Sequence, residues 1–427
     1  MKIRIYHARI LTMEEGRPIF WGEIQIVGNR IQYVGPELEA PADDWDRQID
    51  AQGNLVMPGF KNAHTHSAMT FLRSYADDLP VLEWLEQKVF PMEAKLTSED
   101  IYHLSKLAIL EYLTSGITAN FDMYLTPDTI AKASLDCGFR TVICGTLNDH
   151  CQPFEELEHY YQKYSDPESL VSFRLGFHAE YTNSYENLQK LAELVHKYQA
   201  PIYAHSSESA AEVQGCVERY GVTPTVLFEQ LGLLDYGGGY FHCIHMTDED
   251  LEIFQNRKLH VVTSPASNLK LASGIARISD MLNLGIPVAI GTDGPASNNC
   301  LDMFREMFLV TGLAKLREQD ASAVDAIQVL RMATVEGARV MGLHDADMLV
   351  KGKLADLILI DLQQPNMQPL NHIEKNLVYS GSKQNVLMTM VDGKILYEKG
   401  RFYIGELPEN IYKYANNVIK RMKNNKL

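Results

Sequence analysis

The feature that most limits the fold is an alternation in the centre of the chain, where short apolar runs are separated by stretches of helical periodicity. The strand-like runs cover residues 59–66, 118–124, 140–147, 174–182, 200–205, 239–245, 259–265 and 286–293. Strands that alternate with helices in this number predict an α/β protein built on a (β/α)8 TIM barrel. The alternative, a doubly wound open sheet, is disfavoured because the sequence lacks the Gly-x-Gly-x-x-Gly phosphate turn.

Local signals place helices between these strands. Thr97 is expected to cap a helix, with Asp100 three residues later, and Gly116 is expected to end it. Apolar residues between positions 188 and 195 recur at helical spacing and predict a second helix. The last residues, 408–427, form an amphipathic pattern with a basic opposite side, which we expect to dock on the barrel or on a partner subunit.

Both ends of the chain have the alternation and turn residues of short β-strands. Residues 24–27 and 30–35 flank a Gly-Asn turn, and residues 386–391 and 394–397 flank an Asp-Gly turn. Neither end supplies enough strands for a stable sheet by itself. We therefore predict one small β-sandwich domain built from residues 1–58 and 350–427, interrupted by a barrel domain at 59–349.

The composition of the chain limits the kinds of molecule that it is expected to bind. The chain has 427 residues and a formal net charge of −16, which argues against nucleic acid or an anionic membrane as a partner. The six cysteines are scattered and form no Cys-x-x-Cys pair, as expected of reduced thiols in a cytoplasmic protein. We expect neither a signal peptide nor a membrane span, because no apolar stretch approaches 18 residues.

Polar residues occur at the ends of the predicted strands, where a barrel carries its chemistry. They are His64, His66, Asp122, His178, His205, His242 and Asp293. His64 and His66 are two positions apart, so their imidazoles lie on one face of a strand. Buried together without a metal ion, these side chains would leave several polar groups unpaired. The pattern therefore predicts a metal centre.

Four of these residues have the donor atoms of a metal site. His64, His66 and His205 offer ring nitrogens and Asp293 offers a carboxylate oxygen. This set suits one divalent ion, Zn²⁺ or else Fe²⁺, with a position left for water. Such an ion lowers the pKa of its water toward about 7.

Three further roles concern proton transfer. Glu208 follows His205 by three residues and is placed to move a proton to and from a substrate. His242 is placed to orient or deprotonate the water, and Asp293 can accept a proton from it.

Several stretches together resemble the amidohydrolase superfamily, and most closely its subgroup that deaminates S-adenosylhomocysteine and 5′-methylthioadenosine. The matching stretches are 58–69 (PGFKNAHTHSAM), 90–95, 116–124, 242–245, 264–275 (SPASNLKLASGI) and 291–299 (GTDGPASNN). The resemblance covers nearly the whole chain and implies the barrel, a homo-oligomer, and a purine nucleoside as small-molecule substrate.

The resemblance also implies roles for single residues. It implies that the metal lies on His64, His66, His205 and Asp293, and that Glu208 and His242 transfer protons. By the same resemblance, Glu93 binds the ribose hydroxyls and His178 contacts the purine. Relatives with two metals carry a modified lysine on the fourth strand, and residues 173–178 (FRLGFH) contain none, which favours a single metal.

The chain also departs from the family. The family typically has arginines after the third strand that bind the substrate's tail, whereas residues 141–150 contain none and Arg140 stands at the strand's start. The predicted fourth strand continues with Ala179, Glu180 and Tyr181, where many members of the family carry a small residue and proline. A neutral tail, as in 5′-methylthioadenosine, 5′-deoxyadenosine or plain adenosine, is therefore as plausible as S-adenosylhomocysteine.

The predicted reaction is hydrolytic deamination of such a nucleoside to its inosine analogue and ammonia. The first alternative is the same fold acting on guanine, cytosine, a triazine or a cyclic amide, which Glu93 and its setting disfavour. The second alternative is a non-catalytic scaffold, which the full set of predicted metal ligands disfavours.

Overall fold

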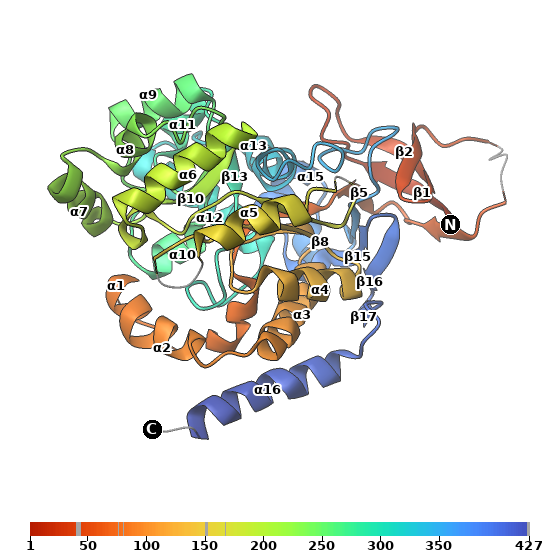
Figure 1. Ribbon diagram of the computed structural model, residues 1–427. Helices are drawn as coiled ribbons and strands as arrows, with labels where there is room; N and C mark the ends of the chain where they lie inside the picture. The colour runs from red at the N-terminus through yellow and green to blue at the C-terminus, as the bar shows by residue number, and fades with distance from the viewer. Residues whose placement is uncertain (40–43, 76, 80, 150–152, 167, 425–427) are drawn as a thin grey trace.

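The computed structural model describes residues 1–39, 44–75, 77–79, 81–149, 153–166 and 168–424 (Figure 1). Strands from both ends of the chain form one 9-stranded sheet in the order β17-β16-β15-β14-β5-β1-β2-β3, with β4 beside β1. Their bounds are β1 Lys2–Ile10, β2 Phe20–Val27, β3 Arg30–Gly35, β4 Arg47–Asp50, β5 Leu55–Pro58, β14 Leu357–Ile360, β15 Val386–Val391, β16 Lys394–Glu398 and β17 Arg401–Phe402. The expected pairing of the two ends occurs between β5 and β14, which run antiparallel. The division at residues 58/59 and 349/350 stays a prediction.

The central strands form two 4-stranded parallel sheets, β6-β7-β8-β9 and β10-β11-β12-β13. Their bounds are β6 Phe60–Thr65, β7 Ile117–Asp122, β8 Arg140–Cys144, β9 Val171–Arg174, β10 Ile202–Ser206, β11 Gly238–His242, β12 His260–Thr263 and β13 Val288–Ile290. A parallel bridge between Gly176 and Tyr203 joins the two sheets on one side. On the other side, the Asp293 N–H donates to the His64 carbonyl at 3.0 Å.

One predicted strand is wrong in its position. Residues 174–182 were expected to form the fourth strand, whereas β9 ends at Arg174. Beyond it, Gly176 and Phe177 make only isolated bridges, and Glu180–Thr182 form a 3-10 turn. The apolar alternation continues past the strand because Leu175 and Phe177 remain buried in the core after the ladder ends.

Helices follow the central strands and cover them (Figure 1). Their bounds are α1 Val81–Trp84, α2 Phe90–Glu93, α3 Ser98–Thr114, α4 Pro127–Cys137, α5 Phe154–Lys163, α6 Tyr185–Tyr198, α7 Ala210–Tyr220, α8 Pro224–Gln230, α9 Asp248–Arg257, α10 Pro265–Lys270, α11 Ile278–Asn283, α12 Met303–Glu318, α13 Ala326–Arg331, α14 Gly337–Val340, α15 Ile373–Tyr379 and α16 Pro408–Asn424. Thr97 and Asp100 form the expected capping box of α3. The helix predicted around residues 188–195 is α6.

The C-terminal helix α16 packs along α3 of the same chain (Figure 1). Arg421 donates to buried Asp100 at 3.0 Å, and the rings of His103 and Tyr414 stack with centroids 3.8 Å apart. Docking of this helix on the chain's own surface, one of the two expected arrangements, is thus what the structure shows. The basic end that we predicted up to residue 427 includes residues 425–427, which lie outside the described residues.

A buried ion pair connects the sheet of the two ends to the central strands. Arg140 at the start of β8 donates to the two carboxylate oxygens of Asp356 at 2.7 and 3.2 Å. Their exposed fractions are 4% and 1%. This partner accounts for Arg140, which stands at the opposite end of the strand from the polar strand ends described below.

Two further observations concern the expectations from composition. Within the described part of the chain, no helix is long and apolar enough to cross a membrane. The cysteines among the described residues are free thiols, whereas Cys151 lies outside those residues.

Candidate active site

A cavity lies at the carboxyl ends of the central strands. The described residues that line it are His66, Met69, Trp84, Leu85, Phe90, Glu93, Met123, Tyr124, Leu125, Thr146, Asn148, His178, Tyr181, His205, Glu208, His242, Leu271 and Asp293. The cavity therefore brings together seven residues that the sequence singled out: Glu93, His66, His178, His205, Glu208, His242 and Asp293. Parallel strands explain this, because their carboxyl ends all meet at one face.

His64 lies immediately behind the cavity wall. It is the fifth residue of β6, is 0% exposed, and stacks on Phe241 with ring centroids 3.9 Å apart. Among the described residues, neither of its ring nitrogens has a hydrogen-bond partner. A buried imidazole normally satisfies both nitrogens. Its Nε2 is 3.5 Å from Asp293 Oδ1, so a ligand held between the two side chains would satisfy it.

Two other histidines have one ring nitrogen fixed by a backbone carbonyl. His66 Nδ1 pairs with the carbonyl of Met123, the residue after β7. His205 Nδ1, on β10, lies 2.7 Å from the carbonyl of His178. In each case Nδ1 carries the proton, which leaves the lone pair of Nε2 for a metal ion. This arrangement is typical of metal-ligating histidines.

Asp293 follows β13 and is held from several directions. Its Oδ2 accepts from Ser267 at 2.6 Å and from Ser297 at 2.8 Å, and its Oδ1 accepts from the Gly294 N–H at 2.8 Å. His66 Nε2 lies 3.2 Å from Oδ1. The backbone of Asp293 is left-handed, with φ of 56°. Strained backbone of this kind is concentrated at functional sites.

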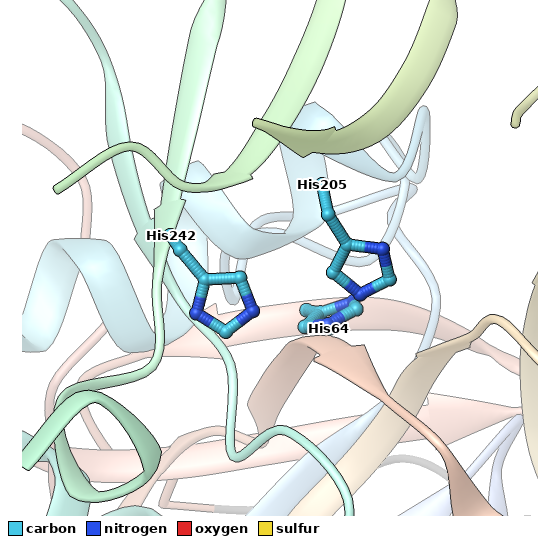
Figure 2. A group of neighbouring side chains, drawn as sticks. All are labelled: His64, His205 and His242. Carbon is cyan, nitrogen blue, oxygen red and sulfur yellow. The ribbon is translucent and has the colours of Figure 1, made fainter. Parts of the chain in front are cut away.

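Within the described residues, the donor atoms form two overlapping groups, each with all atoms within 4.8 Å of one another. One group is His64, His66 and Asp293, and the other is His64, His205 and His242. Figure 2 shows the second group, in which His205 and His242 approach His64 from the opposite side of the site. The rings of His64 and His205 are 4.8 Å apart and those of His64 and His242 are 5.5 Å apart. The donors of these groups fit a divalent metal ion.

His242 ends β11 and is oriented by Asn268. His242 Nδ1 lies 2.8 Å from the amide oxygen of Asn268, and both residues are buried. His242 and the next residue, Cys243, have positive φ values of 71° and 49°. His242 Nδ1–H therefore donates to Asn268, and Nε2 faces the site as an acceptor.

Two of the carboxyl groups that line the cavity, those of Glu208 and Glu93, have raised pKa values. Burial raises the pKa of Glu208, and the nearby His242 counteracts part of that rise. Burial likewise raises the pKa of Glu93 to about 6, with Tyr124 and His66 acting in the opposite direction. Both carboxyl groups thus bind a proton closer to neutral pH than an ordinary glutamate does. His178 lies on the same cavity wall, and its Nδ1 is 3.1 Å from the hydroxyl of Thr182.

Several residues that shape the site had no role predicted from the sequence. Ser267, Asn268 and Ser297 hold Asp293 and His242, and Tyr124 lines the cavity. All four lie in stretches that resemble the family, and this resemblance was the feature of the sequence that could have identified them. Residues 141–162, which follow the third strand, contain neither arginine nor lysine.

Parallel strands that end in such a histidine and aspartate cluster fit a hydrolase that uses a divalent metal ion. Residues 55–396 match the Amidohydrolase family, and the chain belongs to that family as a hydrolase of carbon–nitrogen bonds.

Known proteins resemble the chain over almost its full length. It is 43% identical over 407 residues to a 5-methylthioadenosine/S-adenosylhomocysteine deaminase of Moorella thermoacetica, covering 93% of this chain and 95% of the relative. An adenosine deaminase from Xanthomonas campestris with bound zinc superposes with a TM-score of 0.93 at 30% identity, covering 99% and 98%. An atrazine chlorohydrolase from Arthrobacter aurescens TC1 superposes with a TM-score of 0.90 at 23% identity, covering 98% and 100%, and shares the fold.

Proposed function

We propose that the chain is a hydrolytic deaminase that converts an adenosine-type nucleoside to its inosine analogue and ammonia. The observation that carries this function is the cavity itself, where a histidine and aspartate cluster faces two carboxyl groups of raised pKa. The relatives that are named deaminases of such nucleosides support it.

We also propose finer features of the scaffold and the metal. The Gly176–Tyr203 bridge and the Asp293–His64 hydrogen bond support closure of the two parallel sheets into one eight-stranded barrel. The sheet built from both chain ends would form the predicted β-sandwich beside it. One Zn²⁺ per chain would be held by His64, His66, His205 and Asp293, and it would supply a water of lowered pKa.

In the proposed mechanism, the residues of the chain move protons to and from the substrate and the water. Glu208, whose pKa is raised by burial, donates a proton to the ring nitrogen beside the amine-bearing carbon, which becomes more electrophilic. Water adds to that carbon while His242 Nε2, oriented by Asn268, accepts its proton. His242 passes this proton to the amine, directly or through Asp293, and the amine leaves as ammonia while the added hydroxyl returns its remaining proton to Glu208. Water and the nucleoside thus give the inosine analogue and ammonia.

Glu93 and His178 are proposed to bind the substrate. Glu93 Oε1 is buried without a partner among the described residues, and a carboxylate suits the hydroxyls of a ribose. His178, which also lines the cavity, would contact the purine. Cytoplasmic location, a homo-oligomer, and the lack of nucleic-acid and membrane partners stay predictions from the sequence.

The decisive experiment measures ammonia release from a panel of compounds. The panel contains adenosine, 5′-deoxyadenosine, 5′-methylthioadenosine, S-adenosylhomocysteine, guanine, cytosine, a triazine and a cyclic amide. Turnover of one or more adenosine derivatives is expected. Turnover of guanine, cytosine, the triazine or the cyclic amide alone would contradict the proposed substrate class.

A further inference from the structure

Two polar atoms on the cavity wall are buried without a hydrogen-bond partner among the described residues, and they lie near each other. They are the hydroxyl oxygen of Tyr124 and Oε1 of Glu93. Tyr124 is 4% exposed and follows β7, whereas Glu93 ends α2, so two separate parts of the chain supply the pair. Both residues line the cavity. A buried phenol usually bonds to a neighbour, and this one lines the cavity that we propose holds the substrate.

The backbone around Tyr124 fixes its position relative to the metal cluster. Met123, the preceding residue, accepts the Nδ1 hydrogen bond of His66 through its carbonyl. The rings of His66 and Tyr124 are 6.5 Å apart. The phenol therefore stands beside the metal cluster, on backbone whose preceding carbonyl holds a predicted ligand.

The chemistry of the pair is complementary. Burial and the nearby charge of Glu93 keep the pKa of Tyr124 well above its usual value, so the phenol stays protonated and can donate. Glu93 offers carboxylate oxygens that accept. One donor beside one acceptor matches two adjacent hydroxyl groups, of which one accepts and the other donates.

We propose that Tyr124 forms, together with Glu93, a subsite for the vicinal 2′- and 3′-hydroxyls of the substrate's sugar. This inference rests on the proposed function and adds Tyr124 as a residue that determines specificity. Tyr124 donates to one sugar hydroxyl, and Glu93 accepts from the other. The subsite thereby distinguishes a ribonucleoside from a deoxyribonucleoside and from a free base.

The test compares Tyr124→Phe with the wild type on adenosine, 2′-deoxyadenosine and 3′-deoxyadenosine. Loss of one hydrogen bond is expected to lower kcat/KM for adenosine by about 10-fold. For the deoxy substrate that lacks the hydroxyl bound by Tyr124, the loss should be under about 2-fold, since that substrate has no bond to lose. The zinc content of the variant should equal that of the wild type.

A stability measurement separates this role from a structural one. Because the Tyr124 hydroxyl has no hydrogen-bond partner of normal geometry among the described residues and interacts only with the adjacent Glu93 carboxylate, its removal should leave the melting temperature of the ligand-free enzyme nearly unchanged. The matched control is Tyr33→Phe, which removes a hydroxyl bonded to the carbonyl of Pro36 at 2.7 Å on the distant sheet. This control should leave kcat/KM unchanged on all three nucleosides.

Two results would overturn the inference while leaving the proposed function intact. One is an unchanged kcat/KM for adenosine in Tyr124→Phe, and the other is an equal loss on all three nucleosides. If the wild type itself neither binds nor deaminates any of them, the inference falls together with the proposed function.

Discussion

His242 and Asn268 form a buried hydrogen bond in which the imidazole Nδ1–H donates to the amide oxygen at 2.8 Å. This bond fixes the tautomer of His242, because a neutral imidazole that donates through Nδ1 has its lone pair on Nε2. Asn268 lies on α10, the helix after β12, and His242 ends β11. The segment after β12 therefore determines which ring nitrogen His242 presents to the site.

Replacement of Asn268 by leucine should therefore impair turnover more than binding. Loss of an orienting partner typically lowers activity by about 10- to 100-fold. We expect this drop in kcat with a small change in KM, and partial recovery in Asn268→Asp, which keeps an acceptor oxygen. Steady-state ammonia release measures both parameters. The control Asn416→Leu, at an exposed position of α16, should behave as wild type. Equal loss in the leucine and aspartate variants would contradict the orienting role.

Metal content tests the proposed ligand set. Elemental analysis of the purified protein should give about one divalent ion per chain, and His64→Ala should bind far less. Both ring nitrogens of His64 are buried without a partner among the described residues, so the alanine variant loses a ligand and no internal hydrogen bond. A metal-free protein with full activity would refute the site.

Glu208→Gln should separate proton transfer from metal binding. Glutamine has nearly the same shape but no proton to exchange, so turnover should fall by about 100- to 10,000-fold. The metal content should stay at the wild-type level, since Glu208 belongs to neither donor group of the described residues. Normal activity in this variant would exclude the role proposed for Glu208.

The contact between α16 and α3 should stabilise the protein in a pH-dependent manner. Burial raises the pKa of Asp100, but Arg421 and the hydrogen bonds from Thr97 outweigh it, so the net pKa lies below the usual 3.8. A carboxylate with a depressed folded-state pKa stabilises the fold above its unfolded pKa and loses that contribution as the pH falls through the folded value. Thermal melts of Arg421→Gln should show a lower melting temperature than wild type at pH 7. The difference should shrink progressively below about pH 4. A difference independent of pH would exclude this origin.

Arg140 should matter for stability and not for substrate binding. Removing one partner of a buried ion pair costs about 3–5 kcal/mol, because the other charge is left unpaired. Urea denaturation of Arg140→Met should show a loss of this size, since Asp356 is 1% exposed. KM should remain that of the wild type under conditions where the variant is folded. A raised KM with unchanged stability would instead place Arg140 at the substrate.

The sequence predicted the parallel strands well because their apolar runs are short, separated by helical periods and followed by polar residues. His205 and Asp293 could be grouped with His66 because the carboxyl ends of parallel strands meet at one face. A polar residue at the end of one strand is therefore expected to lie near those at the ends of the others. The fourth strand was predicted too far along the chain because Leu175 and Phe177 are buried beyond the end of β9.

Contacts between side chains on different elements could not be predicted from the sequence in this way. Asn268 and His242 are 26 residues apart on unlike elements, and no local pattern relates them. Tyr124, which follows β7, and Glu93, which ends α2, likewise meet only at the cavity of the folded protein. An aromatic residue after a strand is ordinary in a core, and its hydroxyl becomes informative only when its surroundings are known.

The pairing of β5 with β14 also determines when the protein can complete its folding during synthesis. β5 pairs with β1 on one side, through Arg9 with Leu55, and with β14 on the other, through Ile360 with Leu55. The ribosome releases β5 before the entire central region, and β14 only after it. Until then one edge of β5 has no strand beside it, and an open edge is a template for wrong pairing. The N-terminal strands therefore keep an open edge until the central region has been made, although they are the first strands of the chain.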